Sequence, residues 1–152
     1  MGFKAKSYAY PYGEFDSNVE TIIRKEGFDY ICNQNAGAVA PFSTPYSIER
    51  IAMGEDTSIK SKLKTRALQV ETFNVTVLDN TIEHVEAVLT DKTIKSVEVY
   101  ITGHTWERVK VNNAKVSYNT KKVLKNERSR VIIKADDKIA SKLIMKRKKN
   151  GQ

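Results

Sequence analysis

Cysteine is nearly absent from this chain of 152 residues, in which Cys32 is the only one. A single cysteine excludes an intrachain disulfide, so packing has to supply the stability that cross-links give to small disulfide-rich proteins. Proline and glycine are also scarce, with three and seven residues, which excludes collagen-like and low-complexity chains. Because 40% of the residues are hydrophobic, the chain can build one domain-sized core. We expect a soluble globular protein.

Long apolar runs are missing as well. No stretch approaches the roughly 20 apolar residues that cross a bilayer as a helix. The first ten residues, MGFKAKSYAY, contain no apolar run of signal-peptide length. We therefore expect no membrane partner, and a cytoplasmic protein or one in a particle assembled in the cytoplasm.

The residues that usually carry catalysis or bind metal are few. His84 and His104 are the only histidines, and Cys32 lies far from both in sequence, so we expect no metal site. The surroundings of Cys32, DYICNQN, match no signature of a nucleophilic cysteine. Neither GxxxxGK[ST] nor GxGxxG occurs, so the usual phosphate-binding loops are missing. We predict a protein that is not an enzyme, with no catalytic residues and no cofactor.

Positive charge is abundant and unevenly distributed. The chain has 26 Lys and Arg against 18 Asp and Glu, a net charge of +8. Residues 59–68 hold four basic and no acidic groups, and residues 121–152 hold 12 basic and three acidic groups. Residues 59–67 alternate with period two, which predicts a strand with one basic face suited to a phosphate backbone. The predicted polyanion contacts are Lys60, Lys62, Lys64, Arg66, Lys146, Arg147, Lys148 and Lys149.

Aromatic residues are concentrated at the other end of the chain, with nine of the 13 in the first 46 residues. The opening SYAYPYGEF alternates aromatic and small residues before a Pro-Tyr-Gly turn, which predicts an extended arm. Between Asp29 and Glu49 lie 19 residues without a formal charge, and such a segment suits the core of an interface. We predict that it lies on a neighbouring subunit, with an ordinary surface loop as the alternative. The predicted partner contacts are Tyr8, Tyr10, Tyr12, Phe42 and Tyr46.

Local patterns predict a mainly β protein. A short helix is expected from Asp16 or Ser17 to just before Gly27, and a further helical turn over residues 47–53. From Val70 onward β signals dominate, and residues 97–101 form the clearest strand. Turns are expected at residues 79–80 and 112–113. Residues 81–89 and 137–149 fit either a helix or a strand.

These elements predict an antiparallel sandwich or barrel-like domain with an extended N-terminal arm and one or two short helices. Antiparallel pairing is favoured because the gaps between predicted strands are short. We expect residues 1–57 to form the aromatic arm, the short helix and the uncharged segment. Residues 58–152 should form the β-rich core with its basic end.

Two functions follow from this organisation. The first is a non-enzymatic structural component of a large multi-subunit complex, such as a small phage-type virion protein, whose aromatic arm contacts other subunits of the same or another kind. The second is a nucleic-acid-binding module without sequence preference that uses the basic patches at residues 60–66 and 121–149. Its partner would be nucleic acid or another acidic surface.

Overall fold

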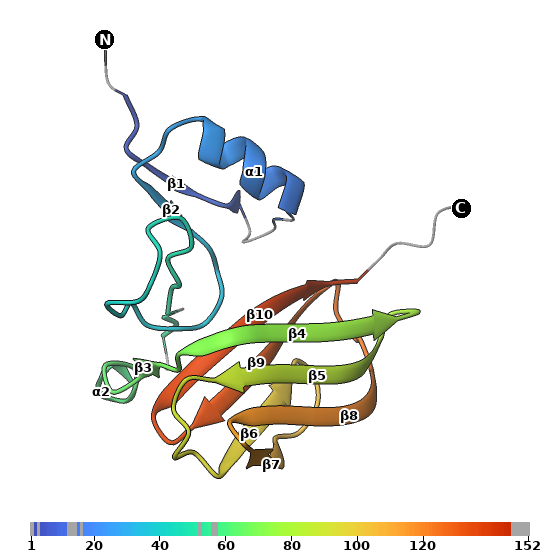
Figure 1. Ribbon diagram of the computed structural model, residues 1–152. Coiled ribbons are helices and arrows are strands. Elements are labelled where there is room, and N and C mark those ends of the chain that lie inside the picture. The colour runs from blue at the N-terminus through green and yellow to red at the C-terminus, as the bar shows by residue number, and fades with distance from the viewer. Residues whose placement is uncertain are drawn as a thin grey trace.

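The computed structural model describes residues 2, 4–11, 15, 17–51, 53–55 and 58–146. Its main feature is one curled sheet of eight strands that forms a half-barrel (Figure 1). The prediction of a mainly β protein with a barrel-like domain is confirmed. The strands of this sheet are β3 (Arg66–Ala67), β4 (Val70–Leu78), β5 (Thr81–Leu89), β6 (Ser96–Ile101), β7 (Glu107–Asn112), β8 (Lys115–Val123), β9 (Arg128–Ala135) and β10 (Lys138–Met145).

The strand order is β3-β10-β9-β6-β7-β8-β5-β4. All neighbours are antiparallel except β3, which pairs parallel with the start of β10 through two residues, Arg66 and Ala67. The antiparallel arrangement follows from short connections. Positive φ angles at Asp79 (47°) and Asn80 (59°) make the predicted turn between β4 and β5. The turn between β7 and β8 uses Asn113 and Ala114, one residue later than predicted.

The core lies on the concave side of the half-barrel. Val97, Val99 and Ile101 of β6 are buried, whereas the residues between them are not, as alternation along a strand with one covered face requires. The same alternation runs along β5 and β9. Of the two segments that fitted either a helix or a strand, residues 81–89 form β5, and residues 138–145 of the second form β10. Residues 147–149 of the second segment lie outside the described residues.

Two local predictions are wrong. Residues 59–67 are not a continuous strand: Ile59–Lys62 form a single helical turn, α2, and only Arg66–Ala67 are extended. The apolar residues that alternate with the lysines in this segment are not buried, since Ile59 and Leu63 are 62% and 80% exposed. The helical turn expected over residues 47–53 is absent from residues 47–51 and 53, which the structure describes, and Ile48 instead forms a parallel bridge to Cys32.

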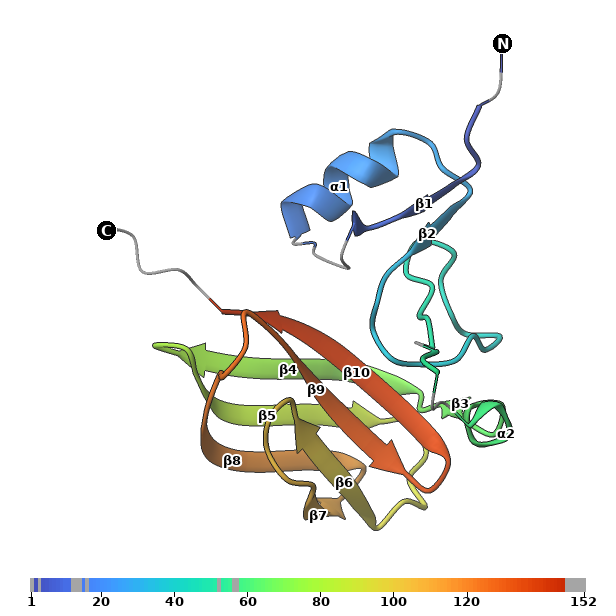
Figure 2. The same cartoon turned by 180° about the vertical axis from the view of Figure 1, so that it is seen from behind.

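The N-terminal part of the chain forms a separate small layer above β10 (Figures 1 and 2). It contains a parallel pair of short strands, β1 (Ser7–Ala9) and β2 (Tyr30–Cys32), with the helix α1 (Ser17–Lys25) between them in sequence. The predicted short helix is thereby confirmed, and Gly27 follows it with a φ of 74°. Residues 33–51, which we call the strap, return from β2 towards the sheet. The division of the chain at residue 57 stays a prediction.

Candidate functional site

The predicted aromatic arm packs on its own chain. The ring of Tyr10 stacks on Phe15 at 4.4 Å between centroids, and Tyr8 lies 5.4 Å from both Tyr10 and Phe28. Tyr10 is only 3% exposed, and burial raises the pKa of its phenol. The ring of Tyr10 is thus covered by its own chain, and partner contact through the predicted residues stays a prediction. Tyr8 is half-buried, and Tyr12 lies outside the described residues.

Phe42 and Tyr46 of the strap remain open to a partner. Their exposed fractions are 48% and 39%, and the neighbouring Val39 is 67% exposed. The guanidinium of Arg24 lies over the Tyr46 ring, 5.2 Å from its centroid, and so links α1 to the strap. Phe42 and Val39 are thus the least covered apolar side chains of the strap.

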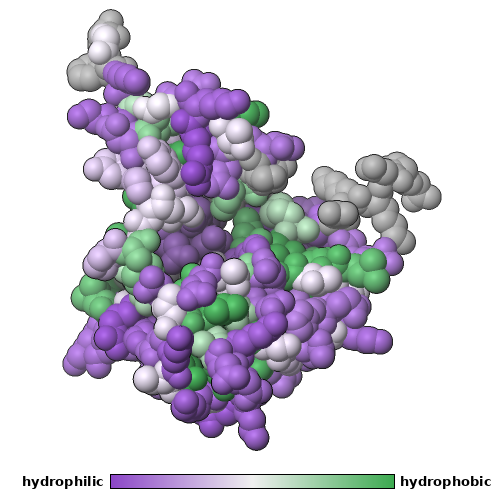
Figure 3. Space-filling model, viewed as in Figure 1, coloured by the Kyte–Doolittle hydropathy of each residue, from purple (hydrophilic) through white to green (hydrophobic). Residues whose placement is uncertain are grey.

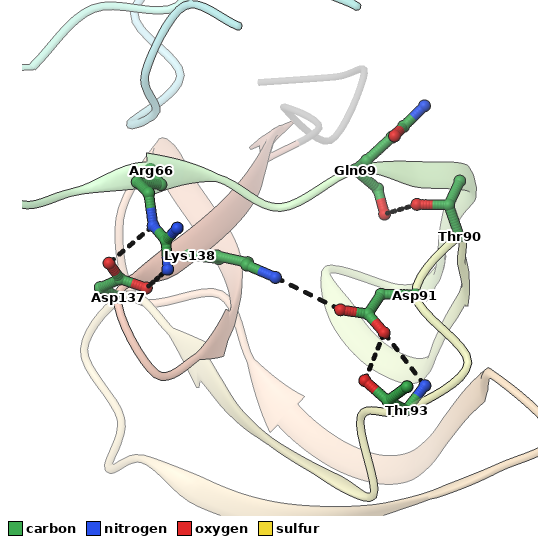
Figure 4. A network of polar contacts seen from close by, with 7 residues as sticks. All are labelled: Arg66, Gln69, Thr90, Asp91, Thr93, Asp137 and Lys138. Carbon is green, nitrogen blue, oxygen red and sulfur yellow. Dashed lines mark hydrogen bonds and ion pairs between the residues drawn. The ribbon is translucent and has the colours of Figure 1, made fainter.

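The predicted basic strand does not present one basic face. Because α2 is helical, Lys60 and Lys62 point about 200° apart around its axis. Arg66 is bound to Asp137, with Nε–Oδ2 and Nη2–Oδ1 distances of 2.7 and 2.8 Å (Figure 4). The hydrogen bonds from Arg66 hold the pKa of Asp137 below its usual range. Lys64 is exposed, but the even spacing expected along a phosphate backbone is absent.

Of the second predicted basic cluster, residues 146–149, the structure describes only Lys146. The backbone N–H of Lys146 donates to Glu127 O at 2.8 Å, and its side chain is exposed. Arg147, Lys148 and Lys149 lie outside the described residues.

The polar network around Arg66 has a structural role instead. Asp91 accepts hydrogen bonds from Lys138 Nζ and from both the N–H and the hydroxyl of Thr93 (Figure 4). The carbonyl of Gln69 accepts from the N–H of Thr90. These contacts tie the β3–β4 link and the loop after β5 to the turn between β9 and β10.

The strap is held by Asn33, a fully buried polar residue. Its side-chain Nδ2 donates to Ser47 Oγ at 2.9 Å, and its Oδ1 accepts from the N–H of Asn35 at 2.8 Å. Its backbone N–H donates to Ile48 O at 2.9 Å. Arg50 Nε donates to the Asn33 carbonyl at 2.6 Å. Every polar group of Asn33 therefore has a partner, which a buried amide requires.

The strap and the sheet enclose a cavity of about 440 Å³, which we call the arginine cavity. Arg50 from the strap and Arg130 from β9 both line it, together with Tyr100 and Ile132 on the face of the sheet opposite the core. Arg130 Nε donates to the carbonyl of Gln34 at 3.1 Å. Within the described part of the chain, neither guanidinium has a carboxylate at ion-pair distance, so two positive charges share this cavity.

A second cavity of about 400 Å³, the glutamate cavity, lies between the strap and the edge formed by β3, β4 and β10. Burial raises the pKa of Glu49 in its wall to about 7, and burial lowers the pKa of Lys142, whose Nζ donates to Phe73 O at 2.7 Å. Asn35 Oδ1 and Ser141 Oγ also belong to lining residues and have no hydrogen-bond partner among the described residues.

These cavities were not predicted from the sequence. One available signal was the alternation along β9, where Arg130, Ile132 and Lys134 occupy the positions opposite the buried Val131 and Ile133. Among the described residues no group of three or more His, Cys, Asp or Glu side chains is arranged to hold a metal ion. Likewise, no helix in the described ranges is long and apolar enough to cross a membrane.

Comparison with models of known protein families, with curated proteins and with solved structures finds no match to this chain.

Proposed function

We propose that the protein is a non-enzymatic assembly component, a subunit that joins other protein subunits through its N-terminal layer and strap. The complex that we propose is a particle built from many chains, such as a phage-type virion assembled in the cytoplasm. The contact would be made by Val39, Phe42 and Tyr46 of the strap.

The observation that carries the proposal is the shortage of core in the first part of the chain. Among the described residues, only two buried apolar side chains precede residue 58, those of Tyr10 and Ile31. The same part exposes Val19, Ile22, Tyr30, Val39, Phe42, Tyr46 and Met53, each at 38% or more. A segment with so little core has few means to offset the entropy of its own ordering. Covering these side chains with a partner would supply the missing burial.

The surface of the molecule supports the same reading. In Figure 3 the largest hydrophobic area of this view lies in the hollow between α1 and β10. Met145 at the end of β10 and Val77 near the end of β4 are 37% and 36% exposed. Large exposed apolar areas of this kind often mark sites of protein association.

Two strand edges are open in addition. β4 pairs with β5 alone, and β10 pairs with β3 only through Lys138 and Ile139, so its remaining residues have no strand partner on that side within the described part of the sheet. Open edges accept strands from other chains. An assembling subunit would use them, whereas a free-standing protein has to protect them.

The proposal is tested by removing the exposed side chains of the strap. In cells that naturally make the protein, a tagged Val39→Ser/Phe42→Ser variant should sediment as free chain, whereas the wild type sediments with a high-mass complex. From the exposed fractions of the two residues, their full burial is worth roughly 2 kcal/mol, or about 30-fold in affinity. Circular dichroism checks that the variant is folded.

Ile59→Ser/Leu63→Ser is the matched control, because these side chains are 62% and 80% exposed in and directly after α2, outside the strap, the hollow and the β4 edge. This variant should sediment as the wild type does. The proposal fails if the wild type sediments only as free chain, or if the strap variant enters the complex as well as the control.

A further inference from the structure

Tyr100, one wall of the arginine cavity, lies beside the exposed aromatic side chain of Trp106, in the loop before β7. The two rings have 5.0 Å between their centroids and 31° between their planes. Trp106 is 46% exposed. An accessible indole that touches the wall of a cavity lined by two arginines offers both a stacking surface and, close by, positive charge.

Backbone carbonyls fix the two arginines of the cavity in place and leave other N–H groups of each guanidinium for an anion. Each donates its Nε to a carbonyl of the strap, Arg50 to Asn33 and Arg130 to Gln34, at 2.6 and 3.1 Å. The Nη groups have no hydrogen-bond acceptor among the described residues, and each guanidinium presents its donors in a planar fork. Guanidinium groups fixed in this way match the oxygens of a phosphate group in both geometry and charge.

Positive charge continues beyond Trp106 on the same face of the sheet. Lys134 lies over the Trp106 ring, 5.7 Å from its centroid, and is paired with Glu98 of β6 at 3.4 Å, so the unpaired charge of this face comes from the next strand. Arg108 and Lys110 follow on β7, both exposed and on the face opposite the buried Val109. Neither of these two has an ion pair within the described ranges. A nucleic-acid strand with one phosphate in the cavity could pass Tyr100 and Trp106 and place a further phosphate near Arg108 and Lys110.

We infer that this face binds single-stranded nucleic acid without sequence preference, with a phosphate in the arginine cavity and a base stacked on Trp106. Alternation of basic and aromatic groups is what such binding requires, because phosphates repeat along the strand and every base has a flat face. A protein carboxylate would use the arginines but would leave the exposed indole unused. The inference does not depend on the assembly role. It replaces the basic strand predicted at residues 60–66 and takes Arg130 and Lys134 from the second predicted patch, residues 121–149.

The experiment uses the only tryptophan of the chain as its probe. The full chain is titrated with an oligothymidylate of about 15 nucleotides, and binding is followed by Trp106 fluorescence and by the anisotropy of a labelled oligonucleotide. We expect saturable quenching, together with an affinity that falls steeply with salt concentration.

Two charge-removing variants locate the contact. Arg50→Gln/Arg130→Gln should weaken binding at least tenfold and lower the salt slope by about two. Arg108→Gln/Lys110→Gln should weaken it several-fold, and because both side chains are exposed on β7 the variant should fold as the wild type does. Lys60→Gln/Lys62→Gln is the control with the same loss of charge, and it should bind almost as the wild type does.

Three results would overturn the inference. One is anisotropy-detected binding with no change in Trp106 fluorescence. Another is an equal loss of affinity in the α2 control and in Arg108→Gln/Lys110→Gln. The third is competition by a glutamate oligomer of equal charge as effective as that by unlabelled oligothymidylate, because the face would then recognise any polyanion.

Discussion

Glu49 makes the stability of this protein depend on pH in a direction opposite to that of most carboxyl groups. Its side chain lies half-buried in the wall of the glutamate cavity, and none of the described residues donates a hydrogen bond to it. Burial therefore raises its pKa from 4.5 to about 7 in the folded chain. Because the folded state binds the proton more tightly than the unfolded state, stability is expected to fall as pH rises from about 4.5 to about 7.

The size of this effect follows from the two pKa values. A difference of one pKa unit corresponds to about 1.4 kcal/mol, so the full difference would cost about 3 kcal/mol above neutral pH. Since the side chain keeps some contact with solvent, screening reduces this figure, and we expect roughly 1–2 kcal/mol. Glu49→Gln keeps the shape and removes the charge. The variant should thus be more stable than the wild type at pH 8 and equally stable at pH 4.

The assay is urea unfolding, followed by Trp106 fluorescence and circular dichroism at several pH values from 4 to 8. Glu71→Gln on β4 is the matched control, because that carboxyl is exposed, and it should leave the pH profile of the wild type unchanged. A difference in unfolding free energy between Glu49→Gln and the wild type that stays constant across this range would show that Glu49 does not couple folding to pH.

Two further predictions concern the core and the strap. Ile133→Ala should lower the free energy of unfolding by about 2–5 kcal/mol, because Ile133 is fully buried in the half-barrel and its truncation leaves a cavity; a loss below about 1 kcal/mol in urea unfolding would contradict the packing described. Asn33→Ala should cost about 1–3 kcal/mol, because it leaves the Ser47 hydroxyl and the Asn35 N–H without their partner. Hydrogen exchange should show faster exchange at Asn35 and Ile48 in that variant, and unchanged exchange there would count against the role given to Asn33.

Strands of the sheet could be predicted from the sequence where alternating apolar residues face the buried core. Val97, Val99 and Ile101 alternate with polar residues and are all buried, so the alternation correctly predicted β6. The alternation around Ile59 and Leu63 has the same form but no core behind it, and one helical turn formed there instead. Period alone therefore does not distinguish a buried strand from an exposed segment.

The cavities could not be predicted, because they depend on contacts between distant parts of the chain. Arg130 meets the Gln34 carbonyl across 96 residues, and Arg50 reaches the same region through Asn33. Phe42 and Tyr46 could be named in advance as exposed aromatic residues of an uncharged segment. The burial of Tyr10 could not, since it depends on how Tyr8, Phe15 and Phe28 pack together.

Site-specific photo-cross-linking tests the assembly role most directly. A benzoylphenylalanine at the position of Phe42, in the full chain and in the cells that naturally make it, should give one discrete adduct with a partner subunit. The same group at Ser117, an exposed position on β8, should give none. Equal labelling at the two positions, or no adduct at position 42, would show that the strap faces solvent in the working protein and would contradict the account.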